Sequence, residues 1–200
     1  MLDALNGGTP SSIILYASLH TAYSSTGSNE VAGGGYARVQ LGTSGADWSS
    51  ASAGTKVLGT APSTFTVPAS TTVEFVGFWS ASSSGTFAGM GPVGAGTQYS
   101  FTATNASPGV FTAPGSSYSN GQQVVLFAGA GATLPAGVTA GTVYFIVSAS
   151  TITFELSATS GGSAINTTAT GAGLVQLIAP ETFGSAGTLQ LTTSTTLYQF

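Results

Sequence analysis

The chain has 200 residues and a formal net charge of −4, and only 4% of its residues are charged. Ordinary soluble domains contain about 25% charged residues, so this surface must be built largely from Ser, Thr, Gly, Ala and Asn. Two cations cannot neutralise a run of phosphates, which argues against nucleic acid and against anionic membranes as partners. The 42% of hydrophobic residues argues against disorder, and the absence of Cys excludes disulfides and thiolate metal sites.

A surface with so little charge has little repulsion to keep copies apart. We therefore expect a homo-oligomer, with a trimer favoured, or a place in a larger assembly. The alternative is a Ser/Thr-rich extracellular surface that has no partner.

The first residues, Met1 to Asn6, predict a short helix ended by Gly7-Gly8. They lack the basic segment that begins a signal peptide. The apolar run Ile13 to Tyr23 is interrupted by polar residues and is too short to span a bilayer, which needs about 20 apolar residues.

The rest of the chain predicts strands separated by frequent turns. Apolar and polar residues alternate in Tyr99–Thr104, Thr151–Ser157 and Thr188–Thr192, as is typical of half-buried antiparallel strands. Three other segments are apolar on both faces, which predicts central strands or strands that face another subunit: Val73–Trp79, Val124–Phe127 and Val143–Val147. The expected fold is all-β, an antiparallel β-sandwich or small barrel.

The chain also predicts two domains, one inserted in the other. Residues 98–176 carry their own set of strands and only one charged residue, Glu155, and are expected to form a small β domain. The remaining segment 177–200 cannot form a core by itself. It is expected to return to residues 1–97 and complete a discontinuous β-sandwich domain, because insertion needs only that the ends of the module lie close together.

Residues able to perform catalysis are scarce. His20 is the only histidine, and no serine lies in a Gly-x-Ser-x-Gly turn, so His20 is expected to be a hydrogen-bonded structural residue. Asp47 and Glu74 could form a pair of carboxylates only through folding. One His and six scattered acids offer no zinc or calcium ligand set. We therefore predict no catalytic residue, no metal and no cofactor.

Three residues are candidates for contacts with other molecules. Arg38 is one of only two cations and is expected to pair with Glu30, with Glu74 or with an acid of a neighbouring subunit. Trp48 lies in a polar, loop-like stretch and is a candidate for an exposed contact. Tyr118 is a candidate, with Trp48, for binding sugars.

Two groups of motifs resemble phage proteins. One group resembles small virion proteins of tailed phages, described as tail-fibre-like, minor tail or head-decoration proteins; it consists of Ser18–Ala22, Asn29–Val31, Gly33–Arg38 and Gly77–Ser80. The other group is similar to a β module that recurs in phage appendage proteins; it consists of Ala106–Thr112, Leu134–Gly137, Gly141–Phe145 and Ser157–Gly162. The resemblance implies a structural role on the outer surface of a phage head or tail, with residues 1–97 and 177–200 as the virion-docking domain.

Within that role, small size and low charge favour a capsid decoration or cement protein bound to the major capsid protein. The alternative is a tail-fibre or minor tail protein that is bound to other tail proteins and contacts host surface glycans. A hydrolase acting on cell-wall sugars is the weakest of the three hypotheses.

Overall fold

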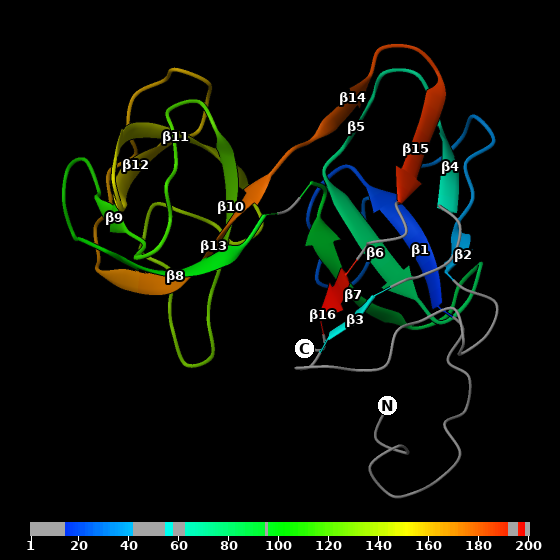
Figure 1. Ribbon diagram of the computed structural model, residues 1–200, viewed down its shortest axis with the longest axis horizontal. Helices are drawn as coiled ribbons and strands as arrows, with labels where there is room; N and C mark the ends of the chain where they lie inside the picture. Colours follow the sequence, from blue (N-terminus) through cyan, green and yellow to red (C-terminus); the bar gives the residue numbers. More distant parts are fainter. Residues whose placement is uncertain (1–14, 42–54, 58–62, 95, 192–195, 199–200) are drawn as a thin grey trace, which may run out of the picture. The chain divides into compact units, whose positions relative to one another are not determined.

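The computed structural model describes residues 15–41, 55–57, 63–94, 96–191 and 196–198. These residues are all β-strands, turns and loops, with no helix among them, which confirms the predicted all-β class (Figure 1). The predicted helix Met1–Asn6, Asp47 and Trp48 lie outside the described residues.

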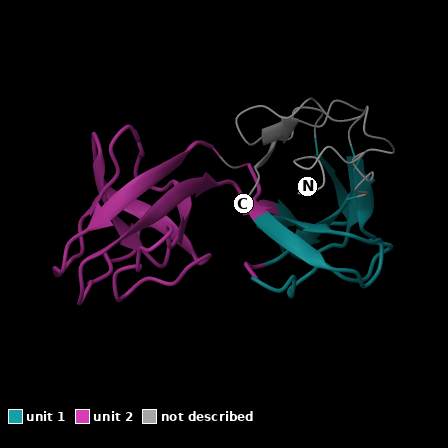
Figure 2. Cartoon of the chain, turned by 90° about the horizontal axis from the view of Figure 1, so that it is seen from below, with its two compact units in different colours: residues 1–21, 25–90, 182–200 teal, residues 22–24, 91–181 magenta. Residues whose placement is uncertain are grey.

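Two compact units divide the chain (Figure 2). Unit 1 consists of Met1–Thr21, Ser25–Met90 and Thr182–Phe200, and unit 2 of Ala22–Ser24 and Gly91–Glu181. The predicted domains change at residues 97/98 and 176/177. The division into a discontinuous virion-docking domain, residues 1–97 and 177–200, and an inserted domain, residues 98–176, stays a prediction.

Unit 1 contains a four-stranded sheet in the order β2-β1-β6-β7. Its strands are β1 (Leu15–His20), β2 (Val39–Leu41), β6 (Phe75–Trp79) and β7 (Phe87–Pro92). β1 pairs antiparallel with both β2 and β6, and Ser18 lies opposite Gly77. Alternation in the neighbouring strand β4 (Ser63–Val67) buries Ser63, Phe65 and Val67 and exposes the two threonines between them.

The last strands of the chain pair with strands from its first half. β14 (Glu181–Phe183) pairs with β5 (Thr71–Val73), β15 (Gly187–Leu191) with β4, and β16 (Thr196–Tyr198) with β3 (Thr55–Val57). In the longest of these ladders, Gly187 lies opposite Val67 and Leu191 opposite Ser63. The chain thus leaves unit 1 after Met90 and re-enters it at Thr182.

The predicted strand Val73–Trp79 is two strands in the structure. β5 ends at Val73 and β6 begins at Phe75, because β5 pairs with β14 whereas β6 pairs with β1 and β7. At the junction, the backbone N–H of Glu74 donates to the carbonyl of His20 at 2.9 Å. The apolar run therefore serves two sheets, and β6 has the central position that its two-sided hydrophobicity predicts.

Unit 2 is a closed ring of six strands in the order β10-β11-β12-β9-β8-β13. The strands are β8 (Gln98–Ala103), β9 (Phe111–Thr112), β10 (Gln123–Phe127), β11 (Val143–Ser150), β12 (Thr153–Ser157) and β13 (Gly171–Ile178). The alternating side chains of these strands fill the ring with an apolar core that includes Phe101, Phe111, Leu126, Ile146 and Phe154. The two-sided segments Val124–Phe127 and Val143–Val147 lie in β10 and β11, each between two neighbouring strands as predicted.

Candidate functional site

The motifs that resemble small virion proteins of tailed phages, the first of the two groups, contribute residues to one hydrogen-bonded network in unit 1. β1 contributes Ser18 and His20, both 0% exposed, and β6 contributes Trp79. The indole Nε1 of Trp79 donates to Ser18 Oγ at 2.9 Å, and Ser18 Oγ lies 2.7 Å from His20 Nε2. The other ring nitrogen, Nδ1, lies 2.8 Å from the carbonyl of Ser28.

This geometry selects one tautomer of His20. A carbonyl can only accept, so Nδ1 carries the proton and donates to Ser28. Nε2 then accepts from the Ser18 hydroxyl, which itself accepts from Trp79. Burial lowers the pKa of His20 below 6.5, so the neutral ring is favoured. The predicted role of His20 as a hydrogen-bonded structural residue is confirmed.

The Ser18–His20 pair does not have the geometry of a hydrolase. Its Nδ1 donates to a backbone carbonyl, whereas a catalytic triad places a carboxylate there. The serine hydroxyl is fully buried. Gly77 lies against it: a Cβ at this position would be 2.6 Å from Ser18 Oγ and 2.5 Å from His20 Nε2. The pair is thus enclosed by β6, where no substrate reaches it.

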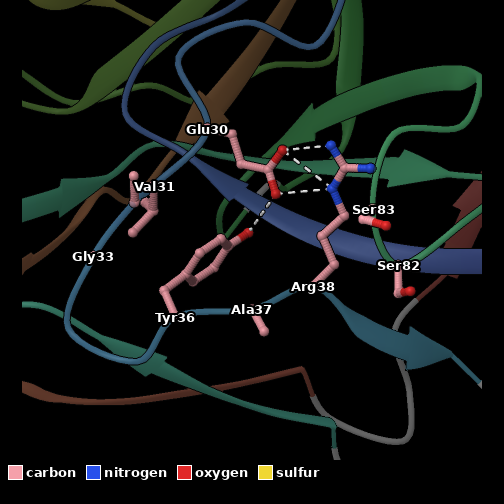
Figure 3. Close-up of a pocket in the computed structure, with 9 residues that line it drawn as sticks. Glu30, Val31, Gly33, Tyr36, Ala37, Arg38, Ser82 and Ser83 are labelled. Atoms are coloured by element: carbon pink, nitrogen blue, oxygen red, sulfur yellow. Dashed lines mark hydrogen bonds and ion pairs between the residues drawn. The ribbon is translucent and has the colours of Figure 1, made fainter.

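A second part of the network joins Arg38 to Glu30 (Figure 3). Arg38 Nη2 lies 2.7 Å from Glu30 Oε2, and Arg38 Nε donates to Oε1 at 2.9 Å, which gives a two-pronged ion pair. The other terminal nitrogen, Nη1, donates to the carbonyls of Ser84 at 2.7 Å and Ala81 at 3.3 Å. Of the partners proposed for Arg38, which were Glu30, Glu74 or an acid of a neighbouring subunit, the structure shows Glu30.

Aromatic rings complete this arrangement. The guanidinium carbon of Arg38 lies 3.6 Å from the centre of the Trp79 ring, a cation–π contact. The Tyr36 hydroxyl donates to Glu30 Oε1 at 3.1 Å and accepts from the backbone N–H of Leu19 at 2.8 Å. Desolvation strongly raises the pKa of Tyr36, so its hydroxyl keeps the proton that it donates.

We call this network the Arg38 clasp. It consists of Ser18, His20, Glu30, Tyr36, Arg38 and Trp79. It ties β1 and β6 to the loop before β2 and to the loop between β6 and β7. Gly27, with a φ of +82°, lets the chain pass close to Trp79, because a Cβ there would be 2.3 Å from the indole.

A pocket of about 410 Å³ opens beside the clasp (Figure 3). Backbone and side chains from three places in the sequence line it: Glu30, Val31, Ala32, Gly33, Tyr36, Ala37, Arg38, Ser82 and Ser83. Ser82 and Ser83 are exposed, and they lie in the loop whose carbonyls at Ala81 and Ser84 are held by Arg38. The pocket thus combines hydroxyls, a neutralised ion pair and a small apolar surface.

The three residues predicted to contact other molecules do not lie together in one site of the described structure. Arg38 lines the pocket, whereas Trp48 lies outside the described residues. Tyr118 is 9% exposed and packs inside the ring of unit 2, where its ring contacts Tyr99 and Phe154 edge-on. Its hydroxyl is buried and has no hydrogen-bond partner among the described residues. The sugar-binding role of Tyr118 stays a prediction.

Sequence reasoning missed Tyr36, Ser82 and Ser83 as parts of a site. Tyr36 belongs to the Gly33–Arg38 motif, but nothing in the sequence places its hydroxyl between Leu19 and Glu30. The serines form a polar run that follows the apolar strand β6, which predicts a loop but no pocket.

Among the described residues, no three His, Cys, Asp or Glu side chains gather in a way that could hold an ion. No helix within the described ranges is long and apolar enough to cross a membrane.

Unit 1 thus carries a buried polar network and a shallow pocket lined by a paired Arg and Glu on an all-β scaffold. The family model described as podophage GP4 fiber I protein gp80 matches residues 1–107, more than half of the chain. The chain therefore belongs to this family of phage fibre proteins and is a structural component of the virion tail fibre. No curated protein matches the chain, and no solved structure matches it.

The family match favours the tail-fibre hypothesis over the capsid decoration hypothesis, which the sequence had favoured. Small size and low charge favoured a capsid decoration or cement protein, but the matching family is one of fibre proteins. The decoration hypothesis is not supported, and the fibre alternative takes its place. Virion tail proteins are accordingly the partners that the family implies.

Proposed function

We propose that this chain is a host-contacting component of the fibre, which binds an uncharged surface polysaccharide of the bacterium that the phage infects. In this proposal unit 1 joins the chain to other virion tail proteins, and the protein has no enzymatic activity. The chain works as a homo-oligomer, with a trimer favoured, because so neutral a surface promotes association.

One observation carries this proposal: in a fibre protein, nearly all exposed polar groups are hydroxyls, amides and backbone groups. Only eight side chains of the 200 are charged, and the one ion pair among the described residues, Arg38–Glu30, is neutralised internally. Such a surface offers hydrogen bonds to sugar hydroxyls but almost no positive charge with which to hold phosphate or an acidic polymer.

The loops of unit 2 have the same chemistry. Because neighbouring strands of the ring are antiparallel, the segments 104–110, 128–142 and 158–170 all leave the ring at one end. None of them contains a charged residue. Two of them, 104–110 and 158–170, are joined at Thr167, which is 3% exposed: its backbone N–H donates to the carbonyl of Ala106, and its hydroxyl donates to the carbonyl of Thr104 at 2.6 Å.

Binding of the full-length protein to polysaccharide extracted from the host tests this function. We expect saturable binding that changes little between low and high salt, because charge screening weakens only interactions between charged groups. Polysaccharide from a bacterium that the phage does not infect is the control. Absence of binding to the host polysaccharide contradicts the proposal, as does binding that is lost when salt is added.

Light scattering of the purified chain tests its oligomeric state. A mass about three times that of the 19.6 kDa chain is the expected result. A monomer at every protein concentration contradicts self-association.

A further inference from the structure

We infer that the pocket beside the Arg38 clasp binds one uncharged sugar residue of the host polysaccharide. This inference rests on the proposed function and adds to it the place where the ligand binds and the groups that hold it.

The pocket is open and shallow, but it has the volume of a small-ligand site. Its volume of about 410 Å³ lies within the range of ligand pockets, roughly 300–1,000 Å³. Ala32 and Ala37, both exposed, offer apolar surface for the C–H groups of a sugar ring, and Ser82 and Ser83 offer hydroxyls. No protein atom is a hydrogen-bond partner of either serine hydroxyl among the described residues, so both are free to bind a ligand.

The clasp holds these groups in place before any ligand arrives. Arg38 contacts the Ser82–Ser83 loop on both sides, through the carbonyls of Ala81 and Ser84, and is itself fixed by Glu30. Tyr36 fixes the opposite wall by bonding both Glu30 and the backbone of β1. A prearranged wall loses less conformational entropy when it binds a ligand.

The charges of the pocket select an uncharged ligand. The guanidinium of Arg38 and the carboxylate of Glu30 form at least two hydrogen bonds with each other, so neither charge is left for a ligand. An anionic sugar would have to displace Glu30, and a cationic one would have to displace Arg38. One N–H of Arg38 Nη2 has no partner within the described part of the chain and can donate to a sugar hydroxyl.

The uncharged loops of unit 2 are the competing location within this protein. Those loops also expose hydroxyls, at Ser163 for example, but in the pocket exposed hydroxyls, apolar surface and a fixed guanidinium lie around one hollow. The observations therefore favour the pocket, and an experiment can compare the two surfaces directly.

The decisive variant is Ala37→Trp in the full-length protein. Ala37 is exposed and lines the pocket without belonging to the clasp, so an indole at this position fills the pocket and leaves the network intact. We expect the affinity for the host polysaccharide, measured by titration calorimetry, to fall at least about tenfold. The control Ala186→Trp places the same side chain at an exposed turn of unit 1 and should bind like the unchanged protein.

Two further variants keep the inference falsifiable. Ser82→Ala combined with Ser83→Ala removes two hydroxyls without adding volume, and we expect a loss of about three- to tenfold. Ser163→Trp alters an exposed position in the loops of unit 2 and should leave binding unchanged.

The possible results separate the two proposals. If the unchanged protein binds and Ala37→Trp binds equally well, the pocket is not the site, although the proposed function stands. Loss of binding in Ser163→Trp alone overturns the inference in favour of the unit 2 loops. If the unchanged protein binds no host polysaccharide, the proposed function itself fails. Competition by a peptide but not by the constituent free sugars also overturns the choice of ligand.

Discussion

Unit 1 and unit 2 are stabilised by different kinds of interaction, although both contain very few charged residues. Unit 2 closes six strands into a ring and fills it with apolar side chains, and its buried polar residues are Ser and Thr. Unit 1 has a four-stranded sheet and several two-stranded sheets. In the Arg38 clasp, charged and aromatic side chains bind one another.

The difference shows what each architecture requires. A closed ring leaves no strand edge unpaired, so hydrophobic packing suffices to hold it. An open sheet with long connections must fix its loops by hydrogen bonds, and in unit 1 the ion pair, His20 and Trp79 provide them. The two units should therefore respond to different changes.

The largest effect is expected from Phe154→Ala in unit 2. Phe154 is 1% exposed and stacks on Phe111 with 5.6 Å between ring centres, so its removal leaves a cavity. We expect the free energy of unfolding to fall by about 3–5 kcal/mol. Hydrogen exchange measured by mass spectrometry should show the loss of protection in residues 91–181. Ile152→Ala, at an exposed position before the same strand, is the control, and loss of protection confined to unit 1 contradicts the prediction.

Gly77→Ala tests the dense packing of unit 1. The added methyl group would overlap Ser18 Oγ and His20 Nε2, so we expect a loss of about 1–3 kcal/mol in the free energy of unfolding. Denaturant unfolding combined with hydrogen exchange checks the size and the location. Gly184→Ala is the control, because its Cβ would meet no atom within 4 Å. Equal stability of the two variants would show that the clasp adapts to a methyl group.

The stability of unit 1 should depend on pH through His20, a member of the clasp, whereas the ring of unit 2 contains no histidine. Because burial lowers the pKa of His20 below 6.5, the unfolded chain binds a proton that folded unit 1 excludes, and stability falls as the pH drops below 6.5. Glu74 acts in the opposite direction, since burial raises the pKa of its carboxyl above 4.5. Urea unfolding should therefore be measured in Glu74→Gln, in which the opposing effect of Glu74 is removed.

The matched variant for this measurement is His20→Gln in the same Glu74→Gln background. It has no titrating imidazole, so its stability should depend less on pH between about pH 7 and pH 5. An identical pH dependence with and without His20 would exclude the imidazole as the cause.

The smallest effect is expected from Tyr118→Phe, and it has the opposite sign. The Tyr118 hydroxyl is buried without a partner among the described residues, and burial raises its pKa to about 12. Removing it should leave the free energy of unfolding unchanged or raise it by up to about 1 kcal/mol. Tyr144→Phe is the control, because the Tyr144 hydroxyl accepts a hydrogen bond from the backbone of Thr139 and its loss should destabilise. A destabilised Tyr118→Phe would reveal a partner for that hydroxyl.

Much of the strand pattern follows from local sequence. Alternation in Tyr99–Thr104 predicts β8, and two-sided hydrophobicity predicts the inner positions of β6, β10 and β11. The break of Val73–Trp79 at Glu74 was not predictable, because it depends on β14, more than 100 residues further along the chain. Pairing between distant segments is a property of the whole fold.

The only parts of the candidate site that could be predicted were those built from residue types that occur once in the chain, arginine and histidine. A lone arginine among so few charges had few partners, and Glu30 was one of them; a lone histidine in an apolar strand was expected to be structural. The pocket was not predictable, because serines, glycines and alanines are common throughout this chain and only folding brings Ser82 beside Ala37.

The pairing of the first and last strands of the ring has a consequence for how such fibres can change. β8 and β13 lie side by side, with Gln98 opposite Gln176, so the chain enters and leaves unit 2 at neighbouring points. Any β module whose entry and exit strands pair in the same way could replace this one without altering the register of β15 on β4. Phages could thus exchange the ring as a cassette between related fibres while keeping unit 1.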